Sequence, residues 1–242
     1  MYGPDFAEIY DPVYTLRGKD YAAEAAQVTE VILARRPGTA SLLDVACGTG
    51  AHLAHFGAAF GHVEGVDVSA PMLEVARARN PGTGLHLGDM RGFDLGRRFG
   101  AVTCLFTAIA HQESAAGLAA TLRCFARHLE PGGITVIDPW WFPETFLDGY
   151  VAADVLKPDH RTIARVSHTA RDGADASLMT VHYVVADAAG ARHFTETYTH
   201  RLFTRAAYEG ALRAAGFAAE FIEAAPSGRG LFVGTLERAG RP

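Results

Sequence analysis

The chain has 242 residues, of which 49% are hydrophobic and 20% are charged, and its formal net charge is −5. This length and composition predict a folded protein with a sizeable core and exclude a largely disordered chain. The acidic balance argues against a nucleic-acid partner, because binding a polynucleotide usually needs a basic face.

Two features bear on where the protein works. No segment reaches the ~18 uninterrupted apolar residues of a transmembrane helix, and no apolar N-terminal run resembles a signal peptide. The three cysteines (Cys47, Cys104 and Cys124) are widely spaced in apolar settings. They are expected to be reduced core thiols rather than a disulfide framework. We therefore expect a cytoplasmic protein with no membrane partner.

The first part of the chain alternates between helical and strand patterns. Residues 1–40 are expected to be helical. Strands are expected at 42–46, 63–68, 85–87, 101–106 and 134–138, with helices at about 51–60, from 70 onward and at 114–128. Ser69 is the predicted cap of the helix that carries Pro71 in its first turn. Strict β-α alternation predicts an α/β protein with a Rossmann-like core, in which a doubly wound, mostly parallel sheet forms the centre.

The pattern changes after Asp138. Residues 139–160 are aromatic-rich and interrupted by prolines, and no strand is assigned there. Three alternating runs follow, at 162–169, 178–186 and 193–203, with glycine turns between them. They predict an antiparallel β insertion over the open end of the parallel sheet. A helix at 205–215 and strands at 221–223 and 231–236 then return to the core. The expected units are 1–138, 139–203 and 204–242.

The most informative stretch runs from Leu42 to Gly50, with the sequence LLDVACGTG. A buried strand that feeds a glycine turn is where an open α/β sheet receives a nucleotide-like ligand. A dinucleotide fingerprint would have a third glycine where Leu53 stands, and a Walker loop would end in Gly-Lys-Ser/Thr, which does not follow here. The form D-x-A-C-G-T-G resembles the first motif of S-adenosylmethionine-dependent methyltransferases. Ala46, Cys47 and Gly48 are accordingly expected to contact that cofactor.

Acidic residues follow the next two predicted strands. Asp67 ends the second strand, where a carboxylate can accept both hydroxyls of a ribose. Asp89-Met90 follows the third strand, and there a carboxylate can take an adenine amino group while Met90 packs against the ring. Val68, beside Asp67, and Phe106, at the end of the fourth strand, are also assigned to the cofactor. A dehydrogenase would place an acid like Asp67 in the same position, so only the glycine spacing separates the two classes.

His111 follows the fourth strand and borders the expected acceptor side of the pocket. A neutral imidazole there can take a proton from an acceptor ammonium, although a surface histidine at a helix start is an alternative interpretation. His52 and His55 have the spacing H-x-x-H on a helix, but no third ligand is evident. No metal site is expected.

Aromatic and basic residues mark the C-terminal half. Asp138-Pro139-Trp140-Trp141 resembles the D-P-P-Y motif of nucleic-acid amino-methylating enzymes only superficially, because it follows the fifth strand and the chain is acidic. Trp141 and Tyr150 are expected to form an apolar wall for a flat substrate group, with core packing as the alternative. Arg229 lies between glycines in a short loop, where it is suited to clamp a phosphate or to be an ordinary exposed arginine.

Together these segments resemble the small methyltransferases that N-methylate dTDP-linked amino-deoxysugars in macrolide biosynthesis. The resemblance covers nearly the whole chain. It rests on RGKDY at 17–21, SLLDVACGTG at 41–50, GDMR at 88–91, WWFPE at 140–144, RVSH at 165–168 and PSGRGLF at 226–232. The double-tryptophan and PSGRGLF segments are its most specific parts.

The resemblance implies S-adenosylmethionine as the cofactor, a dTDP-amino-sugar as the substrate, and a homodimer. The 3-amino group is the favoured acceptor, but the sequence leaves open a 4-amino group and whether one or two methyl groups are added. Tyr2 and His111 match residues at the acceptor, where His111 is the proposed proton acceptor. Tyr10 and Arg17 match the cofactor side, and Arg229 matches the side chain that holds the diphosphate. Two alternatives stay open: O- or C-methylation of a small metabolite, and a non-catalytic protein that binds S-adenosylmethionine.

Overall fold

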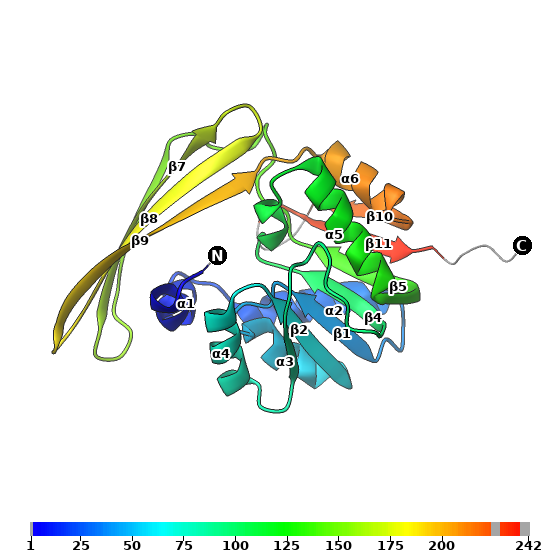
Figure 1. The fold of residues 1–242 in the computed structure, drawn as a ribbon, viewed down its shortest axis with the longest axis horizontal. Coiled ribbons are helices and arrows are strands. Elements are labelled where there is room, and N and C mark those ends of the chain that lie inside the picture. Colours follow the sequence, from blue (N-terminus) through cyan, green and yellow to red (C-terminus); the bar gives the residue numbers. More distant parts are fainter. Residues whose placement is uncertain (1, 224–227, 238–242) are drawn as a thin grey trace, which may run out of the picture.

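The computed structural model describes residues 2–223 and 228–237, and its centre is a seven-stranded sheet (Figure 1). The strand order is β10-β11-β5-β4-β1-β2-β3. The strands are β1 (Ser41–Val45), β2 (His62–Asp67), β3 (Gly84–Leu87), β4 (Phe99–Cys104), β5 (Leu129–Ile137), β10 (Phe217–Ile222) and β11 (Leu231–Leu236). β1 to β5 pair in parallel, whereas β11 is antiparallel to both of its neighbours. The sheet is therefore doubly wound and mostly parallel, as predicted.

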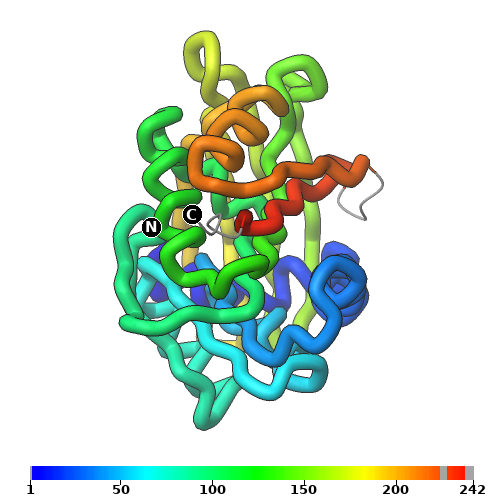
Figure 2. The backbone as a smooth tube through the Cα atoms, turned by 90° about the vertical axis from the view of Figure 1, so that its right-hand side faces the viewer, coloured from blue at the N-terminus to red at the C-terminus, as the bar shows by residue number. Residues whose placement is uncertain are grey.

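Helices cover both faces of this sheet because alternate residues of the buried strands point to opposite sides. Leu42 packs with α2 (Tyr21–Arg35) and α3 (Ala51–Ala59), while its neighbour Leu43 packs with α5 (Ala115–Arg127) and α6 (Arg205–Ala214). Figure 2 shows α2 and α5 on opposite sides of the sheet. The strand order reverses between β1 and β4, so a crevice is expected at their carboxyl ends.

A second sheet lies beside the core and is antiparallel throughout. Its order follows the chain: β6 (Tyr150–Leu156), β7 (Thr162–Asp172), β8 (Ala176–Asp187) and β9 (Gly190–Arg201). The burial alternates along β7 and β8, so one face packs inward and the other is solvent-exposed. β9 is an edge strand, and its free edge approaches the core.

Helix α1 (Pro4–Leu16) fills the space between the second sheet and α4 (Ala70–Arg79), as Figure 1 shows. It buries Phe6 and Ile9 completely in a cluster with Tyr183 of β8 and Met72 of α4. A short break at 17–20 then separates α1 from α2. The N-terminal helix thus connects the two sheets and places its first residues near the crevice.

One strand was not predicted, and two begin well before their predicted starts. β5 begins at Leu129 rather than at 134, because it pairs with Phe99 of β4. The segment with no predicted strand contains β6, a strand that pairs with β7 over its full length. Prolines at 139, 143 and 158 flank β6 without interrupting it, so the composition concealed a strand that pairing supports. β10 covers Phe217–Ile222 rather than 221–223, since its partner β11 pairs along that whole length.

The local predictions for the cap of α4 and for the cysteines are confirmed. Ser69 caps α4 by accepting the Met72 amide at 3.4 Å, and Pro71 lies in the first turn. The three cysteines are buried free thiols. Across residues 2–223 and 228–237, no helix combines the length and hydropathy that a membrane span requires. Pro226 and Ser227 of the PSGRGLF segment lie outside the described residues.

Candidate active site

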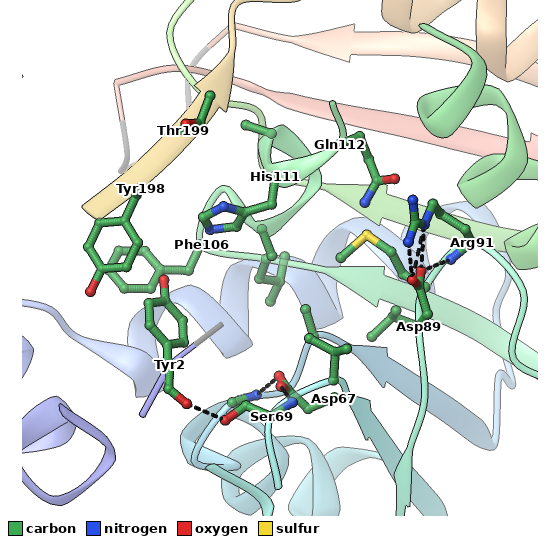
Figure 3. A pocket seen from close by; sticks show the side chains of 18 of the residues that line it. Tyr2, Asp67, Ser69, Asp89, Arg91, Phe106, His111, Gln112, Tyr198 and Thr199 are labelled. Carbon is green, nitrogen blue, oxygen red and sulfur yellow. Dashed lines mark hydrogen bonds and ion pairs between the residues drawn. The ribbon is translucent and has the colours of Figure 1, made fainter. Parts of the chain in front are cut away.

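A cavity of about 470 Å³ opens at the carboxyl ends of β1, β2 and β4 (Figure 3). Its walls come from four places: the N-terminal residues, the strand ends, the segment after β4, and the free edge of β9. The lining includes Tyr2, Tyr10, Ala46, Gly48, Asp67, Val68, Ser69, Asp89, Met90, Arg91, Phe106, His111, Gln112, Thr197, Tyr198 and Thr199. The size is in the usual range for a small-molecule or cofactor site.

The turn between β1 and α3 forms the floor of the cavity. Ala46 and Gly48 both have positive φ angles, 59° and 54°, and Gly50 follows at 70°. A Cβ at Gly50 would collide with the side chain of Asn80, so only glycine fits there. The bend turns the Gly48 amide towards Asp67, whose carboxylate accepts it at 2.8 Å.

Asp67 organises the next part of the wall. One of its oxygens accepts the Gly48 amide and the other accepts the Ser69 amide, also at 2.8 Å. Burial raises the pKa of Asp67, and the backbone hydrogen bonds act in the opposite direction. Each carboxylate oxygen accepts about two hydrogen bonds, so both oxygens keep capacity for ligand hydroxyls. Ser69 Oγ donates to the Tyr2 carbonyl at 2.9 Å, which ties the N-terminal segment to this edge.

The far end of the cavity contains Asp89, Met90 and Arg91. The Arg91 side chain donates to both oxygens of Asp89, and the hydrogen bonds lower the pKa of that carboxyl. Val68 is 46% exposed and lines the cavity from the β2 side. A flat base can therefore lie between Val68 and Met90 with a carboxylate at its rim.

His111 lies at the opposite end, in a short 3-10 helix (Ala108–His111) that follows β4. Phe106 and Thr107 enter this helix with φ angles of 51° and 65°, an unusual conformation for such residues and one that often marks a functional site. The ring centres of Tyr2 and Tyr198 each lie 6.3 Å from the His111 ring, and Figure 3 shows the three together.

Burial lowers the pKa of His111, while a hydrogen bond to the Thr199 backbone raises it. The lowering is the larger effect, so the imidazole is neutral near pH 7. Because a carbonyl accepts from the nitrogen that carries hydrogen, the other ring nitrogen is left as a base. The site thus presents a neutral proton acceptor at the end that is remote from Asp89.

Five predicted site residues lie outside this cavity. Cys47 lines an adjoining small cavity of about 30 Å³ with Asp44 and His52, and this cavity shares Ala46 and Gly48 with the first. Arg17 donates to Asp154 of β6 at 2.9 Å, and Tyr150 begins that strand with 52% of its surface exposed. The remaining two, Trp141 and Arg229, lie together. For all five, the predicted roles stay predictions.

Arg229 is held against the chain after β5. Its Nε donates to the Pro139 carbonyl at 2.9 Å, and its guanidinium lies 3.2 Å from a carboxylate oxygen of Asp138. The guanidinium carbon is 6.0 and 5.6 Å from the ring centres of Trp140 and Trp141. The double-tryptophan segment and the glycine-flanked arginine therefore form one unit although they are about ninety residues apart in sequence.

Several site residues escaped the sequence analysis. Tyr198 and Thr199 line the cavity from β9, and Gln112 follows His111. His200 lies just behind, with its ring centre 4.7 Å from that of His111. The alternation of the run at 193–203 could have placed Phe194, Tyr198 and His200 on one face, but it could not show which face meets His111.

Comparisons with known proteins agree with this geometry. Residues 42–133 match a family model described as a methyltransferase domain. The dTDP-3-amino-3,4,6-trideoxy-alpha-D-glucopyranose N,N-dimethyltransferase of Streptomyces venezuelae is 52% identical over 97% of this chain and 99% of its own length. A dTDP-4-amino-2,3,4,6-tetradeoxy-D-glucose N,N-dimethyltransferase of Saccharopolyspora spinosa is 47% identical over 97% of this chain and 94% of its own length.

The chain belongs to the dTDP-amino-sugar N,N-dimethyltransferase family. This confirms the resemblance that the sequence motifs predicted. Among solved structures of the family, Streptomyces venezuelae DesVI superimposes with a TM-score of 0.93, at 51% identity over 98% of this chain and all of that chain. CalS10, an amino pentose methyltransferase of Micromonospora echinaspora, was solved with S-adenosylmethionine bound. It superimposes with a TM-score of 0.87, at 48% identity over 94% of this chain and 96% of the CalS10 chain.

Proposed function

We propose that this family member transfers methyl groups from S-adenosylmethionine to the 3-amino group of a dTDP-linked amino-deoxysugar, and that it adds two. The observation that carries the proposal is the layout of one cavity. It has a carboxylate for a ribose at Asp67 and a neutral imidazole for an amine proton at His111. The similar proteins, which are named N,N-dimethyltransferases of dTDP-amino-sugars, support the substrate class.

The cavity residues fit the cofactor chemically. The spare acceptor capacity of Asp67 suits the two hydroxyls of a ribose, and the Gly48 turn allows close backbone approach. Val68 and Met90 offer apolar contacts to adenine, with Asp89 at its amino group. Tyr10 and Phe106 supply aromatic faces next to the remaining, cationic part. When bound, S-adenosylmethionine supplies a methyl group that is already activated by the sulfonium.

The work of the protein is then mainly alignment. Tyr2 and Tyr198 wall the acceptor end, and the strained Phe106-Thr107 turn fixes where His111 stands. Such positioning can account for roughly 7–11 kcal/mol of a reaction barrier. His111 takes the proton that the amine must lose, directly or through a water, so that the nitrogen lone pair is free to attack.

Arg229 is assigned to the sugar nucleotide. Its side chain is only 13% exposed and is already oriented by Asp138 and Pro139, so it loses little conformational freedom when it contacts a diphosphate. Trp141 packs beside it and offers a flat surface to the base or sugar.

The decisive experiment is incubation of the protein with S-adenosylmethionine and three dTDP-sugars: a 3-amino, a 4-amino and a 3-hydroxy form. We expect mass increases of +14 and then +28 with the 3-amino sugar and none with the hydroxy sugar. Methylation of the hydroxy sugar would favour an O-methyltransferase. Binding of S-adenosylmethionine without any methylated product would favour a non-catalytic role.

We also infer a homodimer formed through the outer face of the second sheet. This face exposes apolar side chains on three neighbouring strands: Val151 (60%), Val155 (69%), Val166 (49%), Leu178 (38%) and Val184 (41%). An exposed apolar face of this kind is typical of an interface between protein chains. Val166→Glu should give a monomer in sedimentation velocity, whereas Leu147→Glu, in an exposed loop, should not. A cytoplasmic location stays a prediction from sequence.

A further inference from the structure

His200 is a buried imidazole that the proposed reaction does not yet use. It lies on β9 with 4% of its surface exposed, and its ring centre is 4.7 Å from that of His111, with an angle of 41° between the ring planes. On its other side it stacks on Trp140, with ring centres 4.5 Å apart and planes tilted by 24°. His200 is therefore fixed between Trp140 and the proposed proton acceptor.

The backbone and the indole hold this arrangement. Ser177 of β8 is the direct cross-strand partner of His200. Its hydroxyl accepts the Trp140 Nε1 hydrogen at 3.2 Å and donates to the His200 carbonyl at 3.4 Å. One hydroxyl thus ties the indole to the strand that carries His200, and the ring has little freedom to move away from His111.

The Nδ1 atom of His200 is buried and has no hydrogen-bond partner within the part of the chain that the structure describes. A buried nitrogen without a partner is unfavourable for folding, so a purely packing role would be better served by phenylalanine. A buried N–H without a partner is rarer than a buried acceptor without one. Nδ1 is accordingly expected to be the unprotonated nitrogen, with the hydrogen on Nε2.

We propose that His200 is a positioning residue whose uncharged Nδ1 stabilises the imidazolium that forms when His111 takes the amine proton. This inference rests on the proposed function of His111. In the step, an amine N–H bond breaks, its electron pair stays on the amine nitrogen, and the proton binds the free nitrogen of His111. His200 gains no proton. The favourable contact arises only as His111 becomes charged, so it lowers the barrier without strengthening substrate binding.

The electrostatics of His200 agree with this role. Burial and the nearby His111 lower the pKa of His200 to about 3, so it remains neutral while His111 is protonated. A second cation beside the imidazolium would oppose proton transfer, whereas an uncharged acceptor favours it. Trp140 on the far side offers no nitrogen acceptor, because an indole nitrogen is a donor only, and here it donates to Ser177.

The test compares His200→Phe with wild type, using S-adenosylmethionine and a dTDP-3-amino sugar. Phenylalanine keeps the stack on Trp140 and removes the acceptor. We expect thermal stability equal to or above wild type, a KM for the sugar within about threefold, and a kcat about tenfold lower. His55→Phe, at an exposed position on α3, is the matched control and should behave as wild type. An unchanged kcat for His200→Phe would overturn the proposal.

A double variant tests whether His200 acts through His111. In a His111→Ala background, His200→Phe should change kcat less than twofold, because no imidazolium forms there. The same tenfold loss in both backgrounds would contradict the proposal. So would a rise in KM with kcat unchanged, which would make His200 a substrate-binding residue.

A spectroscopic measurement does not depend on turnover. Long-range ¹H–¹⁵N correlation spectra of the protein, assigned with His200→Phe, should show His200 neutral with hydrogen on Nε2 between pH 6 and 8. A hydrogen on Nδ1, or a charged ring, would overturn the inference even if methylation is confirmed. If wild type methylates no amino sugar, the proposed function fails, and this spectrum still decides the protonation state on which the inference depends.

Discussion

Gly48 donates its backbone amide to the Asp67 carboxylate over 2.8 Å, and this contact joins the turn after β1 to the carboxyl end of β2. The same carboxylate accepts the Ser69 amide, which begins α4. One side chain thus joins two loops at the end of the cavity to which we assign the cofactor.

Asp67→Asn should weaken binding of S-adenosylhomocysteine about 10- to 100-fold in calorimetric titration. The asparagine amide lacks the negative charge that strengthens hydrogen bonds from ribose hydroxyls. Its NH₂ group also cannot accept a hydrogen bond, whereas both oxygens of Asp67 can. Asp159→Asn, an exposed position on the second-sheet side, is the control and should bind as wild type. Unchanged affinity in Asp67→Asn would remove Asp67 from the cofactor site.

His111→Ala should lower kcat about 100-fold, at the lower end of general-base effects, because a deprotonated amine is already a good nucleophile. Affinity for S-adenosylhomocysteine should stay intact. Since burial lowers the pKa of His111, wild type should show a loss of kcat on the acid side with a midpoint below 6.5, and the variant should lack this limb. Total loss of turnover would mean that alignment is not the main contribution.

Arg229→Ala should raise the KM for the sugar nucleotide about tenfold or more, and lower kcat less, because the guanidinium is assigned to the diphosphate. Arg123→Ala, exposed on α5, controls for the loss of one positive charge. Steady-state kinetics with saturating S-adenosylmethionine measure KM and kcat for both variants. Equal KM values in wild type and Arg229→Ala would show that Arg229 does not bind the diphosphate.

Ser69→Ala should cost about 1 kcal/mol of unfolding free energy in urea, since it removes the cap of α4. It should also weaken S-adenosylhomocysteine binding, because the contact with the Tyr2 carbonyl is lost. Ser114→Ala removes the equivalent cap of α5, where the hydroxyl accepts the Gly117 amide at 3.1 Å; Ser114 follows the cavity-lining Gln112 and Glu113 but does not itself line the cavity. It should lose similar stability and keep its affinity. Equal affinities in both variants would show that the Tyr2 contact is unimportant.

Acid stability provides a test of His200. Its folded pKa of about 3 lies below the 6.5 of an unfolded histidine, so the unfolded chain binds the extra proton between these values. The contribution of His200 to the unfolding free energy is therefore fully present above pH 6.5 and is lost as the pH falls from 6.5 towards 3. This one group accounts for about 2 kcal/mol at pH 5. Between pH 7 and 5, the unfolding free energy measured in urea should fall by about 2 kcal/mol less in His200→Phe than in wild type. An equal fall in both proteins would contradict the burial of a neutral imidazole.

Local patterns were enough for the parallel core. The apolar run before Asp44, the glycine turn and the Ser69 cap each act within a few residues, and the structure has them where predicted. β6 was missed because a strand with exposed valines and flanking prolines has no clear local pattern until β7 pairs with it. The start of β10 was missed because its alanines give no clear local pattern, and the strand is defined by its pairing with β11.

By itself the sequence determined the doubly wound core and the carboxylates at its strand ends, because hydrophobic period and turn chemistry are local properties. It also carried the family motifs. Only the tertiary structure decided that β9 brings Tyr198 and His200 against His111, and that Arg229 lies on Trp140 and Trp141. Those contacts join segments about ninety residues apart. The contacts of His111 depend on how the second sheet packs on the core, and those of Arg229 depend on the pairing of β11 with β5.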